Sequence, residues 1–322
     1  MEVANQIKPG IDSFIGWMGG KTKLRPTIIN CFPPHRCYVE VFGGSATVFF
    51  GKPASISKVE VVNDIHEELV NLMKVISGTF FDESVRQEFI GYVRNMPPAR
   101  AVFEDWKKWD EDKIKTLSPA QRAFRYYYCV KNGFSSTPKC GYAASPYGPN
   151  RFNMSTEFDH FAERFRESGA QIERLDFAEL IQKYNRDRAD SFFFMDPPYF
   201  VTDDRNYYEF VFDADKHVKL KECSDQIHAK GNKFMITYDD VQQVIDLYSD
   251  YYIYRTDPIV YQSADERETR DLQKTELFVT NYDLHQVVLG RSMDLFEEVD
   301  ENDTRIGMGK HIGLNRIQKG KS

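Results

Sequence analysis

The segment 191-SFFFMDPPYF-200 constrains the fold more than any other stretch of this chain. Residues 191–195 form a short, almost wholly apolar run between polar segments, which is typical of a strand buried on both faces. The two prolines after Asp196 have no N–H groups to donate, so the ladder of a sheet cannot continue through them. Ligands of open α/β sheets bind beyond the carboxyl ends of such strands, so we expect Asp196 to face a ligand.

The composition fits a globular protein with a substantial core. The 322 residues are 41% hydrophobic and 14% aromatic, which allows one large α/β domain with an insertion or two modest domains. No apolar run approaches the roughly 20 residues that span a bilayer, and the N-terminal MEVANQIKPG lacks the apolar region of a signal peptide. These features favour a cytoplasmic protein.

The five cysteines are scattered, without a Cys-x-x-Cys pair or a neighbouring group of histidines. This pattern favours reduced thiols in the cytoplasm and argues against a disulfide framework or a metal site. The net charge of -7 argues against wholesale coating of nucleic acid, although it permits a local basic face on an acidic body.

The first part of the chain has the pattern of half a nucleotide-binding α/β unit. The stretch 14–29 predicts a loop running into a short helix that begins near Thr22. A strand, a glycine turn and a helix start are predicted in 37–50, and a second strand, ending in an acid, in 58–65. Apolar residues at helical spacing predict a helix over 66–76. Strand, glycine turn, helix, strand and acid follow one another as in nucleotide-binding folds.

The character of the sequence changes after this first part, residues 1–77. In 78–165 aromatic residues mix with Lys and Arg, and we expect a second, smaller and mainly helical domain there. The Gly, Pro and Ser residues of 135–153 predict turns or a hairpin. The α/β pattern returns in 166–300, and the basic tail 301–322 is expected to be loose.

Five elements are expected in this second α/β part besides the strand that ends at Asp196. They are a strand in 171–180 that ends at Asp176-Phe177, a helix over 215–230, a strand over 232–239, and a hairpin-like pair in 251–259 and 275–283 that closes the sheet.

The glycine turn Gly43-Gly44-Ser45 is a candidate ligand site. Glycines after a strand let backbone approach a ligand closely, and a following helix N-terminus favours negative charge. An ordinary tight turn would look the same, because the full dinucleotide fingerprint is absent. Asp64, about twenty residues further on, is placed to bind ribose hydroxyls; the structural alternative is an N-cap for the helix at His66.

Two further residues have both a functional and a structural interpretation. Lys21 follows two glycines, so its ammonium group can reach an anion such as a carboxylate, although most lysines are solvated surface residues. Asp176 and Phe177 are expected at the end of a strand, where Phe177 either stacks on a purine or packs in the core.

The tetrapeptide DPPY at 196–199 suits the activation of an exocyclic amine on a base, whose lone pair is delocalised into the ring. Two acceptors, the Asp196 carboxylate and the Pro197 carbonyl, can take hydrogen bonds from the two N–H groups and free that lone pair. The rigid Pro197-Pro198 pair holds the carbonyl in place, and Tyr199 offers a face for an extruded base. The nitrogen would then attack the methyl sulfonium of S-adenosylmethionine in line. The structural alternative is a Pro-Pro stop to the strand.

Six segments in order, FIGWMGGK, VEVFGGSATVF, NDIHEEL, LDFAE, DPPY and ELFVTNY, together resemble the motifs of one family. That family is the Dam-type DNA adenine-N6 methyltransferases. The resemblance implies a Rossmann-like, S-adenosylmethionine-dependent methyltransferase sheet with an inserted, mainly helical target-recognition domain. It also implies transfer of a methyl group to a flipped adenine in duplex DNA.

The resemblance implies a set of site residues as well. Those that border S-adenosylmethionine are Trp17, Gly19, Gly20, Lys21, Glu40, Phe42, Gly43, Gly44, Ser45, Asp64, Asp176, Phe177 and Asp196. The catalytic residues are Asp196, Pro197, Pro198 and Tyr199, without a metal.

DNA binding is expected in the inserted segment, mostly through salt-sensitive phosphate contacts. The stretch 141-GYAASPYG-148 resembles the family's recognition hairpin, but its Ala-Ala-Ser centre replaces polar residues, which argues against a GATC target. The candidates for DNA contact are Arg122, Arg125, Lys131, Asn132, Lys139, Tyr147 and Arg151. Asn132 or Arg151 is the candidate for reading base edges. For each, a solvated side chain is the alternative.

Two other functions remain open from the sequence. One is methylation of an RNA adenine or of a protein amide, but such sites favour Asn in place of Asp196. The other is a catalytically silent DNA-binding protein of the same fold, against which the intact DPPY argues. The expected setting is a bacterial or phage-infected cell, with duplex DNA as partner, no membrane, a monomeric enzyme and a possible cognate restriction endonuclease.

Overall fold

The computed structural model describes residues 13–17, 20–133, 141–143, 155–200, 212–261, 272–292, 305–306 and 312–317. The chain divides into two compact units. The first comprises residues 1–22 and 43–175, and the second comprises residues 23–42 and 176–322. None of the described helices is long and apolar enough to cross a membrane. The expected domain boundaries near residues 77 and 165 stay predictions.

The first unit contains a parallel strand pair. Strands β2 (Val59–Asn63) and β3 (Gln171–Glu173) pair in parallel. Helix α3 (Glu67–Ser77) follows β2 and buries its apolar residues, as the spacing predicts. It starts at the N-cap His66 and ends at Gly78, whose φ of 62° is the left-handed conformation that suits glycine.

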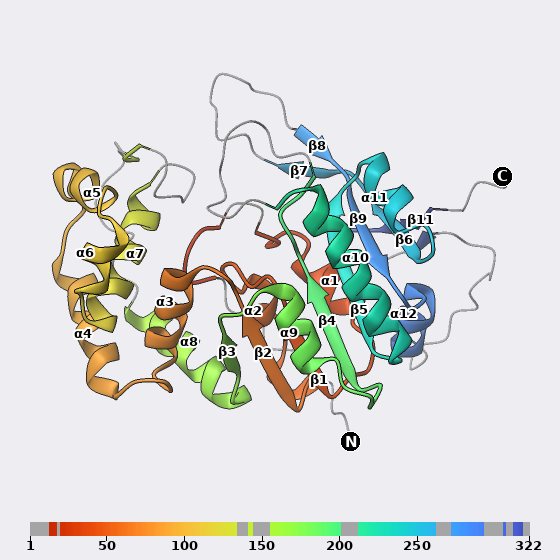
Figure 1. Cartoon of the computed structure of the whole chain (residues 1–322), viewed down its shortest axis with the longest axis horizontal. Helices are drawn as coiled ribbons and strands as arrows, with labels where there is room; N and C mark the ends of the chain where they lie inside the picture. Colours follow the sequence, from red (N-terminus) through yellow and green to blue (C-terminus); the bar gives the residue numbers. More distant parts are fainter. Residues whose placement is uncertain are drawn as a thin grey trace. The chain divides into compact units, whose positions relative to one another are not determined.

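The remaining elements of this unit are helical. They are α2 (Thr47–Gly51), the single 3₁₀ turn Ala54–Ile56, α4 (Glu83–Asn95), α5 (Arg100–Trp106), α6 (Glu111–Lys115), α7 (Pro119–Asn132) and α8 (Ser155–Ser168). Helix α7 begins with a capping box between Ser118 and Gln121 and packs against α3, α4 and α5 (Figure 1). The helical character expected for the inserted segment is therefore confirmed for its described residues.

The second unit is built on a mixed sheet. Its described strands run in the order β10-β11-β6-β9-β5-β4-β1. Strands β1 (Cys37–Glu40), β4 (Ser191–Met195) and β5 (Lys233–Asp239) are parallel neighbours. Strand β9 (Glu276–Thr280) is antiparallel both to β5 and to β6 (Tyr252–Thr256), so it lies between two strands of the same direction. This mixed α/β arrangement is consistent with the expected methyltransferase fold.

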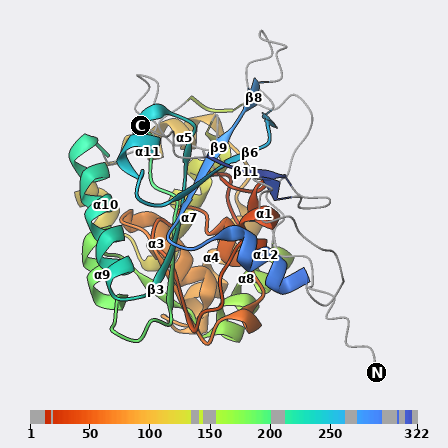
Figure 2. The ribbon, with the colours of Figure 1, turned by 90° about the vertical axis from the view of Figure 1, so that its right-hand side faces the viewer.

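Strand β4 confirms the prediction made from its apolar run. Every residue from Ser191 to Met195 is buried, and β1 and β5 lie on either side of it. Helix α10 (Ala214–Ala229) packs on β5. It lies beside α9 (Phe177–Tyr184), as Figures 1 and 2 both show. The DPPY sequence thus follows the central strand of three parallel strands.

Some expectations for the second unit were wrong. Helix α1 (Arg25–Asn30) begins three residues later than Thr22. The pair β6 and β9 is antiparallel as expected, but β9 lies inside the sheet instead of closing it. Beyond β6 come β11 (Leu314–Arg316) and β10 (Arg305–Ile306), from the tail that we expected to be loose. Elements without a sequence prediction are α11 (Gln242–Leu247), α12 (Leu284–Ser292), β7 (Ile259–Tyr261) and β8 (Leu272–Lys274).

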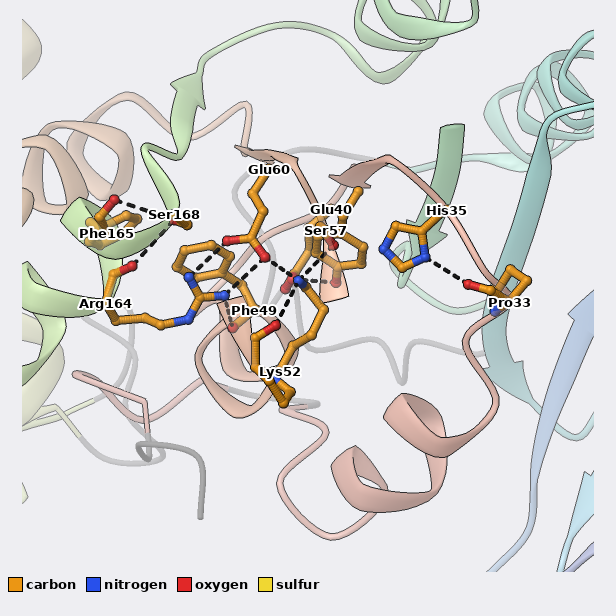
Figure 3. A network of polar contacts seen from close by, with 12 residues as sticks. Pro33, His35, Glu40, Phe49, Lys52, Ser57, Glu60, Arg164, Phe165 and Ser168 are labelled. Carbon is orange, nitrogen blue, oxygen red and sulfur yellow. Dashed lines mark hydrogen bonds and ion pairs between the residues drawn. The ribbon is translucent and has the colours of Figure 1, made fainter. Parts of the chain in front are cut away.

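A buried ion cluster ties α8 to strand β2 in the first unit. Figure 3 shows Lys52 and Arg164 around the carboxyl group of Glu60, which is almost fully buried. Arg164 donates from Nη1 to Oε2 of Glu60 at 2.8 Å and from Nη2 to Oε1 at 3.1 Å, while Lys52 Nζ pairs with Oε1. The guanidinium also lies 4.1 Å from the ring centre of Phe49. One buried carboxylate therefore pairs with two buried cations.

We predict that Glu60→Gln lowers the free energy of unfolding by about 3–5 kcal/mol, because it removes the negative charge with which both buried cations pair. Urea unfolding followed by circular dichroism measures this loss. The matched control is Glu111→Gln, since Glu111 pairs with Lys115 on an exposed face of α6 and should contribute little. Equal unfolding midpoints for the two variants would contradict the prediction.

Candidate active site

The glycine turn after β1 holds the backbone close to strand β2. The Gly43 amide donates to the carbonyl oxygen of Asn63 at 2.7 Å, and a Cβ on Gly43 would lie only 2.8 Å from that oxygen. Ala46, which has a φ of 53°, precedes helix α2 and donates its amide to the carbonyl of Gly43. A side chain at Gly43 would therefore push the turn away from the strand.

Trp17 packs against the second glycine of this turn. Gly44 has a φ of +50°, and a Cβ there would lie 2.7 Å from Nε1 of Trp17. The Gly20 amide donates to the Trp17 carbonyl at 3.0 Å, and a Cβ on Gly20 would lie at the same distance from that oxygen. Trp17 and the glycine turn, both singled out in the sequence, thus meet in the first unit.

Asp64 connects this turn to the start of helix α3. Its Oδ2 accepts the Gly44 amide at 2.8 Å, and its Oδ1 accepts the His66 amide at 2.9 Å. Burial raises the pKa of Asp64, and the hydrogen bonds from the backbone amides lower it in part. Each carboxylate oxygen has two lone pairs, so both can still accept a ligand hydroxyl.

The structural alternative for Asp64 is wrong in its details. The N-cap of α3 is His66, whose Nδ1 accepts the Leu69 amide at 3.2 Å. Asp64 lies before the cap and fixes its backbone. The residue between them, Ile65, was not singled out from the sequence, yet its large apolar side chain is 43% exposed beside the acid.

Lys21 and Ser45 are the other described candidates in the first unit. Lys21 is only 5% exposed, which is unusual for a lysine and requires polar or anionic surroundings. Ser45 is also buried, and its hydroxyl bonds the Thr47 hydroxyl at 2.9 Å. Gly19 lies outside the described residues.

Two aromatic candidates of the second unit, Phe42 and Phe177, form a cluster with Phe212, which was not singled out from the sequence. The rings of Phe42, Phe177 and Phe212 lie 5.6–5.7 Å from one another. We expected Asp176 at the end of a strand, and this was wrong, because β3 stops at Glu173. Asp176 is instead the N-cap of α9, and its side chain accepts the Ala178 amide at 2.9 Å. A helix start therefore presents Phe177 to the other two rings.

Glu40, the last residue of β1, is buried. Its Oε2 accepts the Tyr38 hydroxyl at 2.7 Å.

Asp196 lies directly after β4 and contacts the neighbouring strand β5. Because Met195 pairs with Ile236, Asp196 is level with Thr237, whose hydroxyl donates to its Oδ1 at 2.7 Å. Pro197 is buried, and Pro198 is partly exposed. The hydroxyl of the half-buried Tyr199 lies 2.8 Å from Oε2 of Glu276 and 3.4 Å from Oδ1 of Asp196. The four residues of the motif thus end in a network with β5 and β9.

His217 lies behind the residue that follows the motif. Its ring stacks on Phe200 at 3.7 Å and meets the edge of Phe212, while Nδ1 is hydrogen-bonded to the Tyr238 hydroxyl at 2.9 Å. Burial lowers the pKa of His217 to about 4, so the ring is neutral at physiological pH. Among the described residues, its Nε2 has no hydrogen-bond partner.

Sequence reasoning missed Thr237, Glu276 and His217. Glu276 lies within a segment that carried the family resemblance, but no local pattern marks any of the three as a partner of the DPPY motif. Pairing between β4 and β5 would have pointed to Thr237, because the register fixes its level. Among the described residues, no group of three or more His, Cys, Asp or Glu side chains is placed to hold a metal ion.

The described candidates for DNA contact already have partners within the first unit. Arg122 pairs with Glu67 and Glu68 of α3. Arg125 donates from Nη2 to the Trp106 carbonyl at 2.5 Å, and the buried Asn132 donates to the Tyr128 carbonyl at 2.8 Å. Arg122 thus joins α7 to α3, Arg125 joins α7 to α5, and the Asn132 bond lies within α7.

The other candidates for DNA contact are Lys131, Lys139, Tyr147 and Arg151. Lys131 lies 5.6 Å from the ring centre of Tyr127. Lys139, Tyr147 and Arg151 lie outside the described residues. DNA contact by all seven candidates stays a prediction.

Comparison with known proteins agrees with the motif order. The family model described as "D12 class N6 adenine-specific DNA methyltransferase" matches residues 17–260. The chain belongs to this family. The Type II methyltransferase M1.LlaDCHI of Lactococcus lactis subsp. cremoris is 23% identical over 294 residues, which cover 88% of this chain and 99% of that protein.

A second similar protein is longer. The modification methylase LlaI of Lactococcus lactis subsp. lactis is 24% identical over 234 residues, which cover 69% of this chain and 36% of that protein. The chain is thus an adenine-specific DNA methyltransferase and a homologue of restriction-modification methylases.

If the turn borders S-adenosylmethionine, as the sequence predicts, Gly44→Ala should weaken binding of this donor by about tenfold or more, because a Cβ strains the left-handed backbone and meets Trp17. Isothermal titration calorimetry measures the affinity. Gly91→Ala is the control, since a Cβ there meets nothing within 4 Å in helix α4. Unchanged affinity in the Gly44 variant would contradict the role of the turn.

Proposed function

We propose that this methyltransferase takes its methyl group from S-adenosylmethionine and transfers it to N6 of an adenine that is flipped out of duplex DNA. The observation that carries the proposal is the position of Asp196, at the carboxyl end of a strand buried on both faces and followed by two prolines. When bound, S-adenosylmethionine supplies an electrophilic methyl group on a sulfonium. The protein's own residues must hold this donor and make the adenine amine nucleophilic.

The residues of the first unit fit the donor chemically. Asp64 can accept the two ribose hydroxyls, because its Oδ2 accepts the Gly44 amide and its Oδ1 accepts the His66 amide, and each oxygen has a second lone pair. The backbone of Gly43 and Gly44 carries no side chain that would keep a ligand away. The Lys21 ammonium suits the carboxylate of the methionine part, and the exposed Ile65 side chain offers apolar surface next to Asp64.

Asp196 and Pro197 supply the two acceptors that the amine needs. Both N–H groups of the adenine N6 amine donate, one to the Asp196 carboxyl group and one to the Pro197 carbonyl, which draws the lone pair out of the ring. Thr237 holds the Asp196 carboxyl group by a hydrogen bond of 2.7 Å, so the acceptor need not reorient during the reaction. The Tyr199 ring stacks on the extruded base.

Duplex DNA, a partner nuclease and the cellular setting belong to the same proposal. Phosphate contacts from the inserted segment hold the duplex, and Lys131 and the basic residues of 139–151 are the first candidates. Since one similar protein is named a Type II methyltransferase, we propose a cognate restriction endonuclease that reads the same site. The enzyme works as a monomer in the cytoplasm of a bacterial or phage-infected cell, where its DNA substrate lies.

We predict that the affinity for S-adenosylmethionine falls as the pH is lowered from neutrality toward the raised pKa of Asp64. The ionised carboxylate accepts the ribose hydroxyls, so donor binding favours this form and lowers its pKa in the complex. Affinity is therefore complete above the pKa of the free protein and is lost below it. Calorimetry across this pH range measures the effect, and Asp64→Asn should bind weakly with a flatter profile. If the affinity of Asp64→Asn depended on pH as steeply as that of the wild type, Asp64 would not be the group that causes the pH dependence.

We predict that Asp196→Ala lowers methyl transfer by about a hundredfold or more, because the amine loses its charged acceptor. Affinities for duplex DNA and donor should change little, as fluorescence anisotropy and calorimetry can measure. The control is Asp187→Ala, an exposed acid of the same unit. Loss of folding and of both affinities in Asp196→Ala would show a structural role instead.

The wild-type assay uses a donor with a labelled methyl group, offered duplex DNA, structured RNA and a peptide in competition. Label at adenine N6 of the duplex is the expected product. Label on RNA or peptide alone would reject the proposed substrate.

A further inference from the structure

The Tyr199 hydroxyl lies between two carboxyl groups but carries a single proton. Its oxygen is 2.8 Å from Oε2 of Glu276 and 3.4 Å from Oδ1 of Asp196. A distance of 2.8 Å is typical of a strong O–H···O bond, whereas 3.4 Å lies beyond the usual range. One hydroxyl donates one hydrogen at a time, so Tyr199 donates to Glu276 and not to Asp196.

The fold holds Glu276 rigidly in this position. It is the first residue of β9, only 7% exposed, and its amide donates to the Thr256 hydroxyl at 3.0 Å. Its partner across the ladder is Asp239 of β5, two residues after Thr237. Residues two apart on a strand face the same side, so Thr237 and Glu276 approach the DPPY motif from one face of the sheet.

The direction of this hydrogen bond matters for Asp196. A hydrogen bond from Tyr199 to Asp196 would withdraw charge from the carboxyl oxygen that the adenine amine needs as an acceptor. Asp196 already accepts from Thr237 at 2.7 Å, so a second hydroxyl donor would weaken it further. Glu276 prevents this competition because it accepts the hydrogen bond of the Tyr199 hydroxyl.

We propose that Glu276 is a positioning residue for methyl transfer: it draws the Tyr199 hydroxyl proton away from Asp196 and thereby keeps Asp196 an acceptor for the adenine amine. The same hydrogen bond sets the tilt of the Tyr199 ring. This inference rests on the proposed roles of Asp196 and Tyr199. It adds a residue that acts on the reaction only through those two.

The test is a double-mutant cycle between Glu276 and Tyr199, read as kcat and KM for a duplex DNA substrate. Glu276→Met keeps the volume but accepts no proton, so Tyr199 turns to Asp196 and kcat falls by about 10- to 100-fold. Tyr199→Phe removes the hydroxyl and lowers kcat by about threefold. In the double variant the competing donor is gone, so kcat recovers to the level of Tyr199→Phe alone.

Three comparisons separate this role from a purely structural one. Glu276→Gln, whose amide oxygen still accepts, should keep a kcat within about threefold of the wild type. Donor affinity and KM for DNA should stay unchanged in Glu276→Met, which localises the loss to the chemical step. Glu276→Ala gives the same expected pattern and replaces the Met variant if that variant does not fold.

Additive losses in the double variant would overturn the proposal, since removal of the Tyr199 hydroxyl would then rescue nothing. A fully active Glu276→Met would overturn it as well. The proposed function itself would fail differently, because the wild type would then not label duplex DNA at all. A wild type that methylates DNA, with no coupling between Glu276 and Tyr199, rejects only this inference.

Discussion

Two prolines that cannot donate hydrogen bonds end strand β4, and the candidate active site depends on this ending. Inside the sheet, β4 is held by backbone bonds to β1 and β5 and is buried along its whole length. At Asp196 the backbone ladder stops, and the contact with β5 is the hydrogen bond from the Thr237 hydroxyl to the Asp196 side chain. The candidate catalytic residue Asp196 therefore comes directly after the last paired residue of a buried strand, which holds its backbone in place.

Asp64 also lies at the end of a strand, but its hydrogen-bond partners are backbone amides. Its two oxygens accept amides from Gly44 and from His66, so a single carboxylate fixes both a glycine turn and a helix start. The cost is a buried charge with a raised pKa. Both acids are thus placed by the ends of strands: Asp196 accepts the Thr237 hydroxyl, and Asp64 accepts backbone amides.

Much of the fold could be predicted because its signals are local. The apolar run of β4, the helical spacing of α3 and the glycine turn before α2 each depend on a few consecutive residues. Thr237 and Glu276 could not be predicted as partners of the motif, because only strand pairing brings them to it from 41 and 77 residues away. Arg122, expected to contact phosphate, instead pairs with acids 54 and 55 residues distant. The tail strand β11 is too short to leave an apolar pattern, and its pairing with β6 orders it.

The buried cluster of Lys52, Glu60 and Arg164 and the exposed charges of this protein differ in their response to added salt. Mobile ions screen exposed phosphate contacts and compete for them, but they cannot enter a site from which water is excluded. Concentrated salt should therefore lower the affinity for DNA, while the ion pair between Glu60 of β2 and Arg164 of α8 stays intact. Ionic strength is thus a means of releasing bound DNA that leaves the scaffold intact, which suits both repeated turnover and purification free of nucleic acid.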